Sequence, residues 1–193
     1  DRSTGNEGLM KEYTDYMSVT DSNYGKELRD SFNSGKAPES AGNWVAKGIS
    51  ADKLVYWGES HDTWSNNQDY GYSNDMSQNV IDRAYAVAAS RNQITALYFS
   101  RPSSKVKTNI MAGVKGSTHF TSNEVAEVNR FHNAMIGQKD SYAKSNNCSV
   151  VTREQGAVIV KGSGSGSVTV ENAGNLTKPG TYTDQVSGNK FTV

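Results

Sequence analysis

The chain has 193 residues, no formal net charge at pH 7 and 35% hydrophobic residues. This length suits one domain, or one and a half smaller ones. Ser, Asn, Gly and Thr make up the shortfall in hydrophobic residues, so the composition does not indicate a highly charged disordered chain. The neutral charge and the lack of any long Lys/Arg run disfavour nucleic acid and anionic membrane surfaces as partners.

Other features of the sequence exclude further kinds of site and classes of protein. A single cysteine, Cys148, excludes an intrachain disulfide and any zinc site built from cysteines. No apolar run has the length that a membrane-spanning helix needs. The first residues lack the pattern of a signal peptide, which we expect for a mature or truncated start.

The first half of the chain alternates strand-like and helix-like segments. A short strand is expected at Tyr16–Thr20, followed by a helix that Asp21 or Ser22 caps and that runs to Phe32. A helical turn is expected at Ile49–Asp52. The clearest strand is Leu54–Glu59, because β-branched and aromatic residues fill it.

Two more helices and one more strand are expected further along the chain. A polar loop is expected from Thr63 to Asp75, and then a helix that Ser77 caps, with Arg91 in its last turn, where it suits the helix dipole. Its apolar face consists of Val80, Ile81, Ala84, Val87 and Ala88. The next strand is Thr95–Ser100, which Arg101-Pro102 ends. After a loop, Thr121 and Glu124 predict a capping box for a helix that ends at Gly137.

These segments amount to three βα units, which predict a parallel sheet. A complete parallel barrel has eight such units, and three strands alone would leave two open edges. The preceding units are therefore expected upstream of Asp1. From about Asn146 to Val193 only short strand-like runs remain, which predicts a small antiparallel sheet. They are Ser149–Thr152, Ala157–Lys161, Ser167–Val170, Thr181–Thr183 and Phe191–Val193, with Lys161–Ser167 as a loose hairpin turn.

The candidate site is Ser60-His61-Asp62, because chemistry in parallel α/β barrels takes place where strands end. Amide and aromatic side chains in the following loop would suit a sugar. Three consecutive residues do not converge as a Ser-His-Asp triad, since neighbours in an extended chain point to opposite sides. The other histidines, His119 and His132, give no His-x-x-x-His pair, so zinc is disfavoured, and His132 is expected to be a half-buried structural residue. Simple capping of the loop by His61 and Asp62 remains an alternative.

The segment from Leu54 to Thr63 resembles the fourth conserved segment of the α-amylase family, in which a strand ends in His-Asp. The wider pattern resembles bacterial secreted α-amylases of the Bacillus subtilis type, with the matching blocks in the family's order. The other blocks are 16–25, 50–55, 86–91, 98–102 and 128–135.

The resemblance implies a fold of the α/β plus all-β class. Residues 1–140 would form about strands six to eight of a (β/α)8 TIM barrel, and residues 141–193 an incomplete antiparallel β-sandwich domain. Asp62 would be the catalytic carboxylate that stabilises the transition state, and His61 would bind the sugar. The nucleophilic aspartate and the acid/base glutamate would lie upstream of Asp1. Glu7 is not assigned the acid/base role, because the strand residues that should surround it are missing.

The resemblance also implies an activity and a location. The full-length protein would be an extracellular enzyme that cuts α-1,4 bonds within starch and maltooligosaccharides and retains the anomeric configuration, whereas this fragment alone would be inactive. Calcium would be bound by the complete fold, with its ligands outside this chain. Two alternatives stay open: a glucan-binding or degenerate amylase without catalysis, and a related transglycosylase or debranching enzyme.

Overall fold

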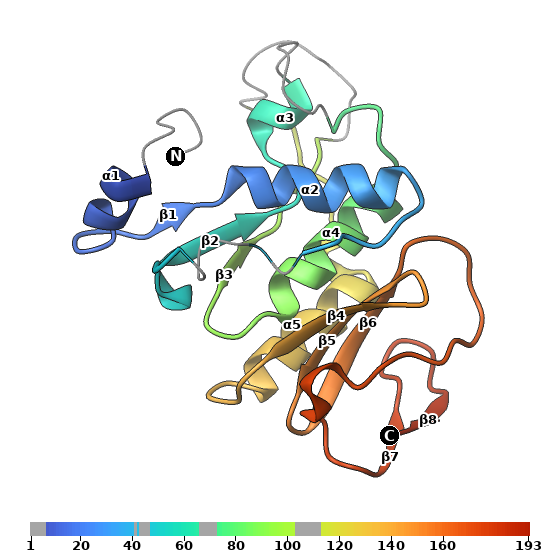
Figure 1. Ribbon diagram of the computed structural model, residues 1–193. Helices are drawn as coiled ribbons and strands as arrows, with labels where there is room; N and C mark the ends of the chain where they lie inside the picture. Colours follow the sequence, from blue (N-terminus) through green and yellow to red (C-terminus); the bar gives the residue numbers. More distant parts are fainter. Residues whose placement is uncertain (1–6, 41, 43–46, 66–72, 103–112) are drawn as a thin grey trace.

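The computed structural model describes residues 7–40, 42, 47–65, 73–102 and 113–193. Its first part is an α/β layer with a parallel sheet in the order β1-β2-β3 (Figure 1). The strands are short: β1 (Val19–Thr20), β2 (Leu54–Trp57) and β3 (Thr95–Leu97). Val19 lies opposite Leu54, and Tyr56 lies opposite Ala96. All three strands were expected in these places, but each is shorter than the sequence predicts.

Helices connect and follow these strands. Within the described residues they are α1 (Glu7–Tyr13), α2 (Ser22–Asn33), α3 (His61–Ser65), α4 (Gln78–Ser90) and α5 (Asn123–Ala134). Single helical turns occur at η2 (Ala51–Lys53), η3 (His119–Thr121) and η4 (Ala173–Asn175). Helices α2 and α4 pack against β2 and against each other, and α5 packs against α4. None of the described helices has the length and apolar character needed to cross a membrane.

The capping chemistry explains where α2 and α4 begin. The Asp21 carboxylate accepts a hydrogen bond from the Tyr24 backbone N–H (2.9 Å), and the Ser77 hydroxyl accepts one from Val80 N–H (3.3 Å). Each bond satisfies a donor that the first turn leaves without a partner. Both caps confirm the sequence prediction.

Two helix-end predictions are wrong. The cap of α5 is Ser122, whose side chain makes no cap hydrogen bond, while Thr121 ends η3 and donates its hydroxyl to the Thr118 carbonyl. Because η3 occupies Thr121, α5 is capped one residue later than predicted, and Ser122 does not form the expected capping box. Arg91 lies just beyond α4 rather than in its last turn, and its Nε pairs with Asp140 at 2.5 Å.

The second part of the chain is antiparallel. Strands β4 (Ser141–Ser145), β5 (Cys148–Arg153) and β6 (Gly156–Lys161) form one sheet, and β7 (Thr181–Thr183) and β8 (Lys190–Thr192) form a hairpin. The strand predicted at Ser167–Val170 is not formed, and Val168 is 37% exposed there. The predicted hairpin around Lys161–Ser167 is therefore absent as well, although the Lys161 ammonium donates to the Ser165 and Gly166 carbonyls.

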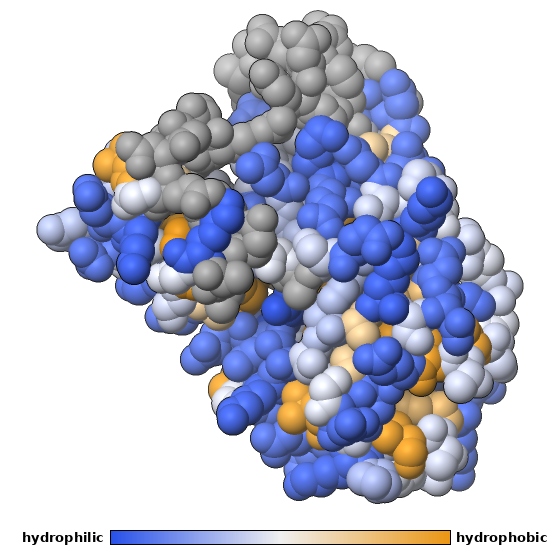
Figure 2. All heavy atoms as spheres, in the orientation of Figure 1, coloured by the Kyte–Doolittle hydropathy of each residue, from blue (hydrophilic) through white to orange (hydrophobic). Residues whose placement is uncertain are grey.

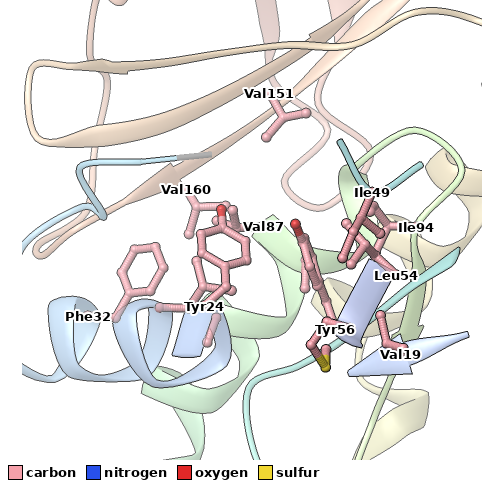
Figure 3. Packing of buried hydrophobic residues seen from close by; sticks show 14 residues of the cluster. Val19, Tyr24, Phe32, Ile49, Leu54, Tyr56, Val87, Ile94, Val151 and Val160 are labelled. Carbon is pink, nitrogen blue, oxygen red and sulfur yellow. The ribbon is translucent and has the colours of Figure 1, made fainter. Parts of the chain in front are cut away.

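One hydrophobic core joins the two parts. Val151 and Val160 of the antiparallel sheet lie in the same buried cluster as Tyr24, Tyr56 and Val87 of the α/β layer (Figure 3). The surface is otherwise mostly hydrophilic on the face drawn in Figure 2. The domain boundary between residues 140 and 141 falls where β4 begins, but because the core is shared it stays a prediction.

Candidate functional site

The candidate site lies at the carboxyl end of β2, where the chain turns into α3. This end of a parallel sheet is where α/β barrels carry their chemistry. Leu54 and Tyr56 are each 1% exposed and point into the helix-covered core, while Val55 and Trp57 alternate to the other face and are half-buried. The strand thus anchors the residues that follow it.

His61 and Asp62 begin α3 and face solvent. Their side chains are 80% and 67% exposed, and His61 Nε2 lies 3.4 Å from Asp62 Oδ1. The sequence predicts a loop from Thr63 onward, but a five-residue helix stands at its start. The exposed pair can therefore meet a ligand from solvent, while the rest of the helix turns inward.

The inward face of α3 is built from Thr63 and Trp64, which are 8% and 6% exposed. Thr63 Oγ1 accepts from the Ser60 N–H at 2.9 Å, and the Ser73 N–H donates to the Thr63 carbonyl at 3.0 Å. The Ser60 hydroxyl accepts from the Thr63 N–H at 3.4 Å. Ser60 thus serves the local turn, consistent with the rejection of a triad among these consecutive residues.

A buried ion pair that the sequence reasoning missed lies below α3. Arg101, just after β3, donates from Nε and Nη2 to the two carboxylate oxygens of Glu59, each at 2.9 Å. The Glu59 side chain is fully buried. The sequence did contain a signal for this pair. A carboxylate in a strand that is expected to be buried needs a cationic partner, and Arg101 directly follows the next predicted strand, Thr95–Ser100.

The structure describes only some of the loop side chains that the sequence predicts as sugar contacts. Trp64 is buried against Arg101, with the guanidinium carbon 4.6 Å from the ring centroid, so it is occupied by a protein contact. Asn66, Asn67 and Gln68 lie outside the described residues. A cavity of about 290 Å³ lies at the amino-terminal end of β3 near Thr95 and Asn129. That is the sheet end opposite His61 and Asp62, so we do not assign it to the chemistry.

The remaining histidines have structural contacts. His132 is half-buried, as predicted, and its Nδ1 lies 2.8 Å from the Ala89 carbonyl oxygen. His119 Nε2 lies 2.7 Å from Asp82 Oδ2, and Tyr98 donates to the other oxygen of Asp82 at 3.0 Å. Burial, together with Asp82, raises the pKa of Tyr98 far above its ordinary value. Among the described residues no three His, Cys, Asp or Glu side chains gather into a group that could hold a metal ion.

Comparisons with known proteins point to one family. No protein-family model matches the chain. It is 32% identical to an α-amylase of Clostridium acetobutylicum over 151 residues, which are 77% of this chain and 18% of that protein. It is 28% identical to an α-amylase of Butyrivibrio fibrisolvens over 207 aligned positions, 95% of this chain and 21% of that protein. The family these comparisons support is the α-amylase family. The chain spans about a fifth of the length of these curated relatives.

Solved structures agree at the level of the fold. α-Amylase I of Eisenia fetida matches with a TM-score of 0.62 at 16% identity, covering 92% of this chain and 42% of that one. A mutant of the same α-amylase in a maltohexaose complex gives 0.59 at 17% identity, over 91% of this chain and 42% of that one. The mixture of helices and sheets seen here is therefore that of part of an α-amylase chain.

Proposed function

We propose that the protein containing this chain is an endo-acting, retaining hydrolase of α-1,4-glucosidic bonds. This chain would supply Asp62 as the carboxylate that stabilises the transition state and His61 as a sugar ligand. The observation that carries the proposal is the exposed His61-Asp62 pair at the carboxyl end of a parallel strand, in a chain similar to α-amylases. The maltohexaose complex of the similar Eisenia fetida α-amylase supports maltooligosaccharides as ligands.

The chemistry explains why a third carboxylate helps. Cleavage of a glucosidic bond passes through an oxocarbenium-like transition state, with positive charge on the sugar ring. A fixed carboxylate whose hydrogen bonds to ring hydroxyls strengthen in that state binds it more tightly than the substrate, which lowers the barrier. An imidazole N–H from His61 would position the same sugar.

The bond-breaking pair would come from elsewhere in the protein. A retaining glycosidase needs a nucleophile and an acid/base about 5 Å apart. We infer from the family resemblance that both precede Asp1. This chain covers only about a fifth of its relatives, and in the described residues β1 and β3 pair only with β2. The 193 residues alone are then inactive on starch. Secretion and calcium binding by the complete protein belong to the same proposal, with calcium ligands outside this chain.

Substitution of Asp62 by Asn in the full-length protein tests the role of the carboxylate. Removal of one transition-state contact of this kind typically lowers kcat by about 10²–10³-fold. Because Asp62 is exposed, we expect the Tm to change little. Steady-state hydrolysis of soluble starch, together with a thermal melt, measures both effects.

Asp52→Asn is the matched control, because Asp52 is an exposed carboxylate at the opposite end of the same strand. Its kcat should equal that of the wild type. Unchanged turnover in D62N would remove Asp62 from the mechanism. Tight maltohexaose binding without any hydrolysis by the wild-type protein would favour a non-catalytic glucan binder, and transfer or branch-point products would favour the related enzymes.

A further inference from the structure

The Glu59–Arg101 ion pair has a geometry that fixes orientation as well as charge. Two parallel N–H···O bonds of 2.9 Å join the planar guanidinium to both carboxylate oxygens. The side chains of Glu59 and Arg101 are 0% and 12% exposed. A bidentate pair removed from water has one preferred arrangement, because any rotation breaks one of its bonds.

The same guanidinium contacts two further segments. Nη1 donates to the Met76 carbonyl at 3.0 Å and Nη2 to the Ser73 carbonyl at 3.1 Å. Its carbon lies 4.6 Å from the Trp64 ring centroid, within the range of a cation–π contact. Arg101 thus links the end of β2, the buried face of α3 and the segment that leads into α4.

Helix α3 depends on these contacts. It has five residues, which is too short for a helix to be stable from its own hydrogen bonds. Thr63 ties it to Ser60 and Ser73, and Trp64 rests on Arg101. The first two residues of this helix, His61 and Asp62, face solvent, with side chains that are 80% and 67% exposed.

We propose that Arg101 is a positioning residue that holds α3, and with it the Asp62 carboxylate, in the orientation that the reaction needs. This inference rests on the proposed function, in which Asp62 stabilises the transition state. A misplacement of about 1 Å in such a group costs on the order of 10²-fold in rate. Arg101 acts through Glu59 and Trp64 and does not itself touch the sugar.

Arg101→Lys in the full-length protein is the first test. Lys keeps the positive charge, but it cannot form the bidentate hydrogen bond to Glu59 and has no planar guanidinium to stack on Trp64. We expect kcat per folded enzyme to fall about 10–10²-fold, with KM within about 3-fold of the wild type. Arg130→Lys is the control: Arg130 is 71% exposed, pairs with Glu127 on α5 and should leave both constants unchanged.

A double-mutant cycle with Asp62→Asn separates positioning from general stability. In the D62N background there is no carboxylate left to position, so R101K should lower kcat by less than about 2-fold more. A chromogenic maltooligosaccharide with an activated leaving group keeps the residual rate measurable. A full 10-fold or greater further loss in that background would overturn the proposal, as would an unchanged kcat in R101K alone.

Trp64→Leu gives a second route that keeps the ion pair intact. It removes the aromatic face between Arg101 and α3, so the same loss of kcat and the same non-additivity with D62N are expected. If neither R101K nor W64L folds, these residues serve stability and the proposal fails. If D62N leaves kcat unchanged, the proposed function fails first; if D62N lowers kcat but the other changes act additively, only the positioning role fails.

Discussion

Residues close together in the sequence differ strongly in their exposure to solvent around the end of β2. Asp62 and Tyr56 are only six positions apart, yet Asp62 has a 67% exposed side chain and Tyr56 is 1% exposed. The period-two alternation of β2 and the turn into α3 produce this contrast. Burial, with the Asp21 carboxylate nearby, raises the pKa of Tyr56 well above its ordinary value near 10.

The raised pKa of Tyr56 predicts a loss of stability at alkaline pH. A group with a higher pKa in the folded state than in the unfolded state contributes stability that is present below about pH 10 and lost as the pH rises further. The free energy of unfolding should therefore fall above pH 10, and Tyr56→Phe should flatten that fall. Urea unfolding at several pH values measures it. Tyr16→Phe, at an 85% exposed position, should keep the wild-type slope, and an identical slope in Y56F would refute the prediction.

At the scale of elements, close packing between α2 and β2 sets the frame of the site. Gly25 on α2 lies so near the strand that a Cβ there would be 2.2 Å from the Trp57 carbonyl oxygen. No side chain fits at that distance unless the helix moves. Trp57 ends β2, three residues before the site segment begins at Ser60, so a displaced α2 would also disturb the base of α3.

Gly25→Ala should destabilise the protein. At an exposed position in a helix, Gly→Ala increases stability by about 1 kcal/mol through helix propensity, but overpacking against backbone costs about 1–3 kcal/mol. Because the clash is with backbone atoms, we expect the overpacking cost to exceed the gain in helix propensity. Chemical denaturation should then show a lower midpoint. Gly116→Ala is the control, since a Cβ there would meet Ser100 Cβ at 3.4 Å, an ordinary contact. A G25A variant as stable as the wild type would contradict the packing argument.

The elements that the sequence predicts well have strong local signals. Helices α2 and α4 carry both a capping residue and an apolar face, and β7 matches its predicted range. Strand β4 was missed because Ser141–Ser145 contains few apolar residues and is half-buried throughout, so it shows no clear alternation. The strand expected at Ser167–Val170 has alternating residues, but within the described residues no neighbouring strand pairs with it.

The candidate site was predictable only as a position. His61 and Asp62 were placed at the end of a strand from the sequence, and the structure places them there. Helix α3 could not be predicted, because five residues contain too little periodicity and its stability comes from tertiary contacts. Arg101 was read only as the end of a strand, since its pairing with Glu59 spans 42 positions of sequence.

At the scale of the whole molecule, one arginine joins the two parts of the chain. Arg153 on β5 is 1% exposed, and its guanidinium donates to the Ser90 carbonyl at 2.8 Å and the Met135 carbonyl at 2.7 Å. These carbonyls belong to the last turn of α4 and to the cap of α5, the ends where helix dipoles favour a positive charge. Burial lowers the pKa of Arg153, but a guanidinium stays charged near neutral pH.

Arg153→Met should therefore weaken the joint between the antiparallel sheet and the helices. Each hydrogen bond from a charged donor contributes about 1.5–3 kcal/mol, and the variant leaves two carbonyls without that donor. We expect the free energy of unfolding to fall by about 3 kcal/mol or more, measured by urea denaturation of the full-length protein. Arg130→Met, at a 71% exposed side chain, is the matched control and should change stability by less than about 0.5 kcal/mol. Because Val151 and Val160 belong to the shared core, the loss should appear as one cooperative transition at lower denaturant. Two separate transitions in R153M would instead mean that the sheet and the α/β layer fold independently once the arginine is gone.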